Sequence, residues 1–281
     1  MSELNFSNDW VDKTKQTISI TALLNMMEEP FNQDAVAERT FSKHYNDEKS
    51  EYYHMTVDEI KNEWSRRGQE SIKYGKLSDD YIKYVLSNDE LEIEMWKLDN
   101  NFDNDIRLQN NCSSFDNFWS VFGNKYDFVN REQEVYYLIP NTNYYIKGRY
   151  DSLFKNKETG RYLVIDWKTS GTIDKERKPW TNSLKGPLNI FPDLNWYTYT
   201  TQVYFYKTAL VKSKYLSENI TLDDVDVAIV DLPGKQLKSG YNWEYNLPAY
   251  QYNETLMSNL FNYAVKRTEL QKKIDEKKNN K

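Results

Sequence analysis

Three charged residues in the second half of the chain could do chemistry together. Asp151 and Asp166 are two carboxylates, and Lys168 follows the second of them by two positions. Carboxylate oxygens are the ligands that hard divalent cations such as Mg²⁺ prefer, and a bound Mg²⁺ keeps several waters. Such a cation can polarise a phosphoryl oxygen and activate an attacking water. We therefore expect one cation site, in which Lys168 orients the water or stabilises developing negative charge.

The strands that must position these residues can be placed from the sequence. Residues 161–168 are apolar on both faces until the charged end, which predicts a buried central strand. Residues 132–139 and 144–154 flank the turn-prone Pro140-Asn-Thr-Asn143, which predicts a hairpin. Alternate residues of a strand share a face, so Asp166 and Lys168 should project together and Trp167 to the other side. Asp151 approaches Asp166 if its strand is the antiparallel neighbour.

A predicted helix, residues 199–211, follows this strand. Gln202 and Tyr206 are four residues apart and share a helix face. Gln202 could hydrogen-bond to Lys168 or to a substrate, and Tyr206 could support a phosphate or a base. The alternative for Tyr206 is a core ring beneath the sheet.

The first half of the chain is predicted to be helical. We expect helices at 35–44 and 57–86, the second starting at a capping box of Thr56 and Glu59 and broken by Gly68 and Gly75. A connector follows, with a short helix at 91–98, and a strand at 225–232 and a helix at 254–274 come after the site. The prediction is an α/β fold with a central mixed sheet flanked by helices. Residues 1–125 form its helical N-terminal region, which includes the first core helix, and residues 126–281 form the α/β core with the C-terminal helix, together one compact domain.

Composition limits the classes of protein and of site. The 281 residues suit one large domain or a core with an added lobe, and the net charge of −6 disfavours a general nucleic-acid-coating protein. Residues 147–185, however, carry ten basic and five acidic residues, as a phosphate-binding rim would, although ordinary solvated loops also fit. The single cysteine, Cys112, excludes an iron–sulfur cluster held by four cysteines of this chain. No signal peptide or membrane-length apolar run is apparent, so we expect a cytoplasmic protein with no membrane partner.

The motifs Gly148-X-X-Asp151, Asp166-X-Lys168 and Gln202-X-X-X-Tyr206 together resemble the PD-(D/E)XK nuclease superfamily, and within it the RecB-like exonucleases common in bacteriophages. Asp-X-Lys alone has little specificity, but the combined order and spacing cover most of the chain. The resemblance implies a restriction-endonuclease-like core and hydrolysis of DNA phosphodiesters with Mg²⁺ or Mn²⁺. It implies metal ligation by Asp151 and Asp166, with Lys168 as the catalytic lysine and Gln202 beside it.

Further site residues rest on weaker signals. Glu134 could reach a second metal, although a surface glutamate on an alternating strand is the simpler interpretation. Arg149, Lys185 and Tyr206 are candidates for DNA binding, and Lys185-Gly-Pro187 looks like the loop that borders the substrate path in the phage members.

The N-terminal motif departs from the family. Members often show Gly-Thr-X-X-His followed by Glu on the first core helix, with the histidine helping to bind metal. The corresponding run begins at Gly75 and places Asp79 at the histidine position and Lys83 at the glutamate position. Asp79 could ligate Mg²⁺, the alignment could shift to Asp80, or both could be exposed helix acids.

The resulting hypothesis is a metal-dependent DNA nuclease of phage-type recombination, replication or degradation, acting in the host cytoplasm if phage-encoded. Exonuclease action is preferred on the resemblance alone. The expected partners are DNA and a recombination or helicase protein. The alternative is a catalytically silent DNA-binding or scaffold protein. The presence of Asp151, Asp166 and Lys168 together favours the enzyme. The sequence leaves the oligomeric state open.

Overall fold

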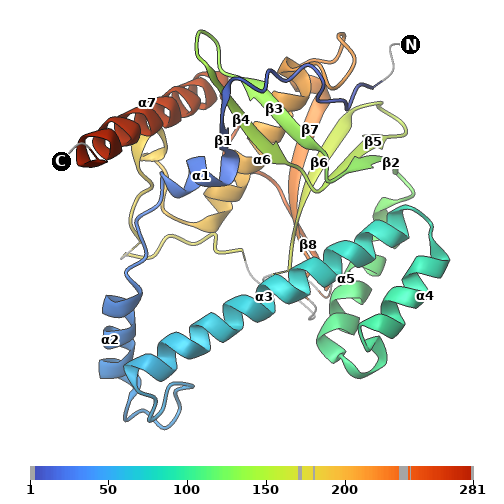
Figure 1. The fold of residues 1–281 in the computed structure, drawn as a ribbon. Coiled ribbons are helices and arrows are strands. Elements are labelled where there is room, and N and C mark those ends of the chain that lie inside the picture. Colours follow the sequence, from blue (N-terminus) through green and yellow to red (C-terminus); the bar gives the residue numbers. More distant parts are fainter. Residues whose placement is uncertain (1–3, 170–172, 180, 234–239, 241, 280–281) are drawn as a thin grey trace. The chain divides into compact units, whose positions relative to one another are not determined.

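The computed structural model describes residues 4–169, 173–179, 181–233, 240 and 242–279 (Figure 1). The predicted class is confirmed, because mixed sheets are flanked by helices and residues 30–112 are helical. The strands are β1 (Gln16–Ser19), β2 (Tyr126–Arg131), β3 (Glu134–Leu138), β4 (Tyr144–Arg149), β5 (Ser152–Asn156), β6 (Tyr162–Lys168), β7 (Val225–Asp231) and β8 (Glu244–Asn246). The α-helices are α1 (Ile20–Asn25), α2 (Gln33–His44), α3 (Val57–Leu86), α4 (Glu90–Asp99), α5 (Ile106–Phe122), α6 (Asn195–Lys212) and α7 (Glu254–Asn279).

The strands form two sheets rather than the one sheet predicted. One has the order β1-β4-β3, and the other has the order β2-β5-β6-β7-β8. The predicted central strand is confirmed, since β6 lies in the middle of the larger sheet, antiparallel to β5 and parallel to β7. Its side chains are buried on both faces from Tyr162 to Trp167, as its apolar sequence requires.

One long hairpin belongs to both sheets. The predicted pairing of β3 with β4 is confirmed, with Glu134 opposite Arg149. The same register continues through Arg131 opposite Ser152, where β2 pairs with β5. Between these pairs the Glu132 amide donates to the Asp151 carbonyl at 3.1 Å. The expectation of an unbroken strand over 144–154 is therefore wrong, because the two-stranded ribbon bends at Glu132 and Asp151 and passes from one sheet to the other.

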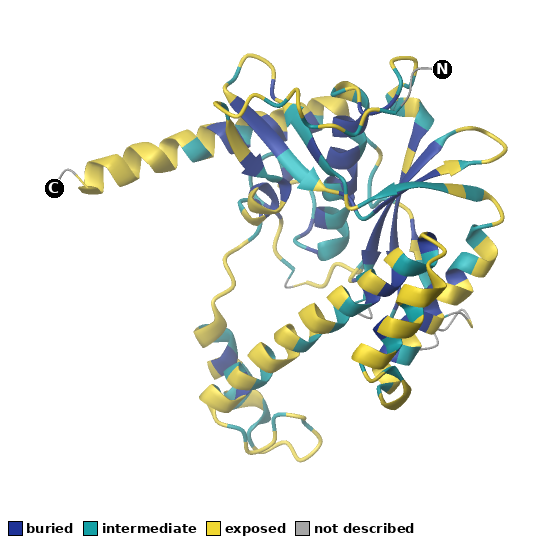
Figure 2. Ribbon diagram, turned by 45° about the vertical axis from the view of Figure 1, so that its right-hand side comes forward, coloured by how far each residue is buried: buried dark blue, intermediate teal, exposed yellow. Residues whose placement is uncertain are grey.

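The core lies between the sheets and α6, which packs against strands of both sheets. Figure 2 shows β6, β7 and much of this helix in the colour of buried residues. The other face of β6 is covered by residues of α5, whose Phe115 and Phe118 rings meet the Trp167 ring edge-on. Trp167 thus points away from α6, as the alternation of the strand predicts.

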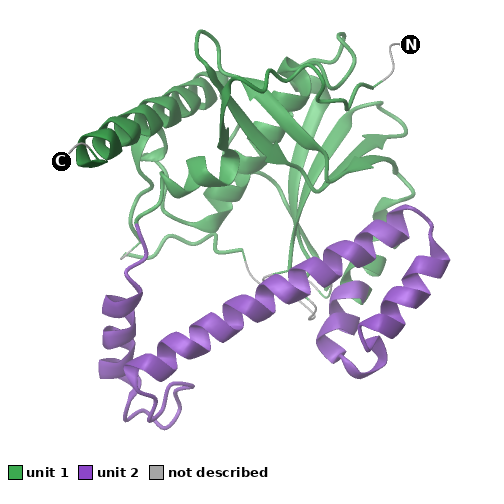
Figure 3. Cartoon of the chain, viewed as in Figure 1, with its two compact units in different colours: residues 1–29, 113–281 green, residues 30–112 purple. Residues whose placement is uncertain are grey.

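The chain forms two compact units, coloured separately in Figure 3. One contains Met1–Glu29 and Ser113–Lys281, and the other contains Pro30–Cys112. In the second unit, α3 starts at the predicted capping box, where the Glu59 amide donates to Thr56 and the Thr56 amide donates to the Glu59 carboxylate. The predicted breaks at Gly68 and Gly75 are wrong, since α3 runs through both.

No helix in the described part of the chain is both long enough and apolar enough to cross a membrane.

Candidate functional site

The structure brings Asp151 and Asp166 to adjacent strand ends. Ser152 pairs with Ile165 across the antiparallel β5–β6 ladder, so the next step of this register places Asp151 opposite Asp166. The Asp151 carboxylate (Oδ2) accepts a hydrogen bond of 2.8 Å from the backbone amide of Trp167. This amide directly follows Asp166, so the backbone next to one candidate ligand orients the other.

Asp166 and Lys168 lie on the same face of β6, as predicted. Lys168 Nζ is 2.6 Å from Asp166 Oδ2, and the two side chains are only 19% and 1% exposed. Burial alone favours the neutral amine, but the charges of Asp166 and Asp151 outweigh it and raise the pKa of Lys168 above its ordinary value. Lys168 is therefore cationic at neutral pH, and its Nζ also lies 4.4 Å from the centroid of the Tyr199 ring.

α6 supplies a polar pair beside these charges. Gln202 Nε2 donates a 2.7 Å hydrogen bond to the Tyr206 hydroxyl. Tyr206 is 1% exposed, so most of its ring is core packing. Burial, followed by the charges of Asp166 and Asp151, raises the pKa of Tyr206 well above its ordinary value. Its hydroxyl stays protonated and holds the amide of Gln202 in place.

Gly148 allows α6 to approach β4 closely. A Cβ atom at this position would lie 2.8 Å from Phe205 Cε1, 2.9 Å from Ile20 Cγ2 and 2.9 Å from Tyr206 Cε1. Only glycine leaves this space free. The glycine of the Gly148-X-X-Asp151 motif thus has a packing role next to the polar pair.

A hollow of about 360 Å³ opens at the bend of the long hairpin. Five of the predicted residues line it: Glu134, Arg149, Asp151, Gln202 and Tyr206. Its wall also includes residues that sequence reasoning missed, among them Ser19, Thr21, Glu132 and Lys147. β1 and α1 contribute to this wall because β1 pairs with β4 from far away in the chain.

Glu132 occupies an unusual backbone conformation at the bend, with φ of 47°. Few residues other than glycine adopt this left-handed region, so the bend holds Glu132 there. The signal available in the sequence was the pair of acids in Glu132-Gln-Glu134 next to a predicted strand.

Glu134 is compensated by its own neighbours. Its carboxylate accepts from the Tyr136 hydroxyl at 2.5 Å and from Lys147 Nζ at 3.2 Å. The Tyr136 hydrogen bond, with help from Lys147 and Arg149 and against burial, lowers the pKa of Glu134. Glu134 therefore lines the hollow as an anion that is already paired.

Asp231 is a further acidic residue close to Lys168. It ends β7 beside Lys168, is 2% exposed, and its negative charge contributes to the raised pKa of Tyr199 after burial and Asp166. The parallel pairing of β6 with β7 brings it there. An aspartate at the end of a second predicted strand was the signal in the sequence.

Lys185 and Asp79 are the remaining predicted residues. Lys185 forms an ion pair of 3.0 Å with Glu29, and the residues that line the hollow do not include it. Asp79 and Asp80 both belong to α3, in the unit of residues 30–112; Asp79 is half-buried and Asp80 is exposed. The roles of Asp79 and Lys185 stay predictions.

The donor atoms fit a hard cation rather than zinc. Asp151 and Asp166 offer only carboxylate oxygens, and among the described residues no three His, Cys, Asp or Glu side chains form a metal-binding group. A structural zinc site takes four nitrogen or sulfur ligands, whereas Mg²⁺ is bound by one or two carboxylates with waters and substrate phosphates. Asp151 lines the hollow and the buried Asp166 lies opposite it in the β5–β6 register, so this pair of carboxylates matches the second case.

No protein-family model and no curated protein matches this sequence.

Proposed function

We propose that this chain is a metal-dependent DNA nuclease with a core of the PD-(D/E)XK type. The observation that carries the proposal is the hydrogen bond from the Trp167 amide to Asp151, because it fixes one carboxylate at the strand end that bears Asp166 and Lys168. Asp151 lines a hollow of about 360 Å³, whereas Asp166 and Lys168 lie next to it on β6 and are not part of the lining.

Each residue has a distinct task. Asp151 and Asp166 would hold Mg²⁺ or Mn²⁺, which when bound polarises the scissile phosphate and lowers the pKa of an attacking water. The raised pKa of Lys168 keeps it protonated, so it serves as an electrostatic partner of the developing negative charge rather than as a general base. Gln202, held by Tyr206, can donate to a phosphate or a water in the hollow.

The substrate phosphates would bind at the rim of the hollow. Arg149 is exposed there and is the basic group best placed to contact a phosphate. Asp79 as a further ligand, Lys185 at the substrate path and a preference for DNA ends are parts of the proposal that rest on the resemblance. A comparison of linear with circular DNA tests the requirement for an end.

The test uses purified protein on both DNA forms with Mg²⁺, with Mn²⁺ or with a chelator. We expect cleavage that needs the metal and falls at least roughly 10²-fold in Asp166→Asn and in Lys168→Ala. Asp127→Asn and Lys155→Ala are matched controls, since both residues are exposed on strands of the same sheet. DNA binding with no cleavage under any metal would instead identify a silent DNA-binding or scaffold protein.

A further inference from the structure

α4 carries apolar side chains on two opposite faces. Trp96 is 6% exposed and packs inside the unit of residues 30–112, whereas Leu91, Met95 and Leu98 are 70%, 49% and 80% exposed. Spacings of four and three residues place the exposed three on one stripe of the helix. An amphipathic helix normally has one apolar face, so the second stripe is a surface that water covers at a cost.

Acidic side chains flank this stripe. Glu94 follows Leu91 by three positions and precedes Leu98 by four, and Asp99 follows Met95 by four. The whole helix has four acidic residues and one lysine, Lys97, which forms an ion pair of 2.7 Å with Glu94. The stripe is therefore an apolar ridge with an acidic border.

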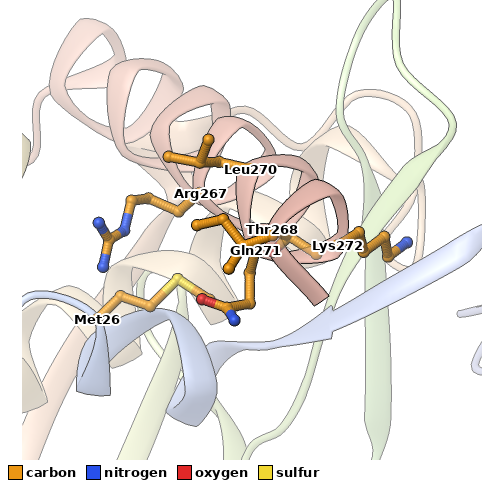
Figure 4. A pocket seen from close by; sticks show the side chains of 7 residues that line it. Met26, Arg267, Thr268, Leu270, Gln271 and Lys272 are labelled. Carbon is orange, nitrogen blue, oxygen red and sulfur yellow. The ribbon is translucent and has the colours of Figure 1, made fainter. Parts of the chain in front are cut away.

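The distal part of α7 has the opposite character. The helix continues from Val265, its last buried residue, to Asn279, and Figure 2 shows this part as exposed. Leu270 and Ile274, four residues apart, are 51% and 39% exposed. Met26, which directly follows α1, lines a hollow of about 340 Å³ together with these two residues. Figure 4 shows side chains that line this hollow.

Basic residues surround these two apolar side chains. Lys266 and Arg267 precede Leu270 by four and three positions, and Lys273, Lys277 and Lys278 follow it by three, seven and eight. All five therefore lie on the helix face of Leu270. Residues 266–279 also contain Glu269, Asp275 and Glu276, which leaves this part of the helix with a net charge of +3. Lys272 also lines this hollow, and its ammonium group bonds to the Tyr144 hydroxyl at 3.2 Å.

We propose that the exposed stripe of α4 in one copy of this chain docks on the distal part of α7 in a second copy. The apolar spacing matches on both helices, and an acidic border meets a basic one. A nucleic acid would satisfy the lysines and leave Leu270 and Ile274 uncovered, whereas the α4 ridge covers them and pairs the charges. The contact joins different surfaces of two copies, so two copies can form it twice around a two-fold axis or several can form it in series.

This self-association is independent of the nuclease proposal and has its own test. Sedimentation of the full chain over a concentration series should show association that weakens with added salt, because the borders are charged. Leu98→Asp and Leu270→Asp should each weaken it at least roughly tenfold, because each places a charge inside the apolar contact. Both side chains are exposed in the single chain, so unchanged circular dichroism and melting temperature would show that the variants fold.

Mixing the two variants identifies the surfaces. Leu98→Asp retains an intact α7 and Leu270→Asp an intact α4, so the mixture should form a heterodimer that neither variant forms as a homodimer. Self-association of either variant alone at wild-type strength would show that α4 pairs with α4 or α7 with α7, which overturns the proposal. A wild-type chain that stays monomeric at every concentration also overturns it, as does loss of DNA binding without any change of mass in Leu270→Asp.

Discussion

The carboxylate of Asp151 accepts its hydrogen bond from the amide of Trp167, the residue that separates Asp166 from Lys168. The distance is 2.8 Å. The backbone of β6 thus orients a side chain that arrives from the bend of the long hairpin. Asp151 serves both the fold, as a hydrogen-bond acceptor, and the proposed chemistry, as a charge.

These two roles can be separated by substitution. Asp151→Asn keeps an oxygen that can accept from Trp167, so its stability should stay close to wild type, whereas Asp151→Ala leaves the amide unpaired at a cost of about 1–3 kcal/mol. Neither variant keeps the negative charge. Mg²⁺ should therefore raise the melting temperature of the wild type and of neither variant. An equal Mg²⁺ effect in Asp151→Asn would remove Asp151 from the metal site.

The buried ion pair of Lys168 and Asp166 makes a second prediction. Lys168→Met leaves a carboxylate that is 1% exposed without its cation, and we expect a loss of up to about 3 kcal/mol in the free energy of unfolding. The double variant Asp166→Asn with Lys168→Met removes both charges of the pair and should lose less than the two single variants summed. Urea unfolding measures all four proteins. Strict additivity would show that the two groups do not interact.

Gly148 and Gly68 form a matched pair of glycines. Gly148→Ala places a Cβ within 3 Å of Phe205, Ile20 and Tyr206, and overpacking of this kind costs about 1–3 kcal/mol. At Gly68, an interior position of α3, a Cβ would meet nothing within 4 Å, so Gly68→Ala should stabilise by about 0.5–1 kcal/mol. Thermal unfolding gives both values. Equal effects at the two positions would contradict the close approach of α6 to β4.

The ion pairs of two arginines on α3 should make the stability of the protein depend on pH. Hydrogen bonds from Arg66 and Arg67 lower the pKa of Glu63 from 4.5 to about 2. Because its pKa is lower in the folded state, this carboxylate stabilises the fold at pH values above its pKa in the unfolded chain. It loses that effect as the pH falls from 4.5 toward 2. The melting temperature of Glu63→Gln should lie below that of the wild type at neutral pH and approach it in acid. Exposed Glu48→Gln is the control, and a difference that stays constant with pH would contradict the pairing.

Local signals were sufficient for much of the fold. α3 begins at its capping box, and its length follows from its apolar spacing, whereas the expected breaks failed because an interior glycine costs only about 1 kcal/mol in a helix that has tertiary support. α5 was missed because its run of Asn, Cys and Ser has weak helix propensity, and Phe115 and Phe118 are fixed by packing on Trp167.

The predicted site was limited by contacts between distant segments. Asp166 and Lys168 share a strand, so the alternation rule alone placed them together. Ser19 and Thr21 join the hollow through the pairing of β1 with β4, and Asp231 reaches Lys168 through the pairing of β6 with β7. Neither pairing can be predicted from the local sequence of its strands.

The bend at Glu132 and Asp151 has a consequence for the order of folding. Because one ribbon supplies strands to both sheets, Asp151 reaches its final place only after β4 has paired with β1 and β5 has paired with β6. Pairings between segments as distant as β1 and β4 are slow to form. Helices and the hairpin turn can appear early, whereas we expect Asp151 and Asp166 to come together late in folding.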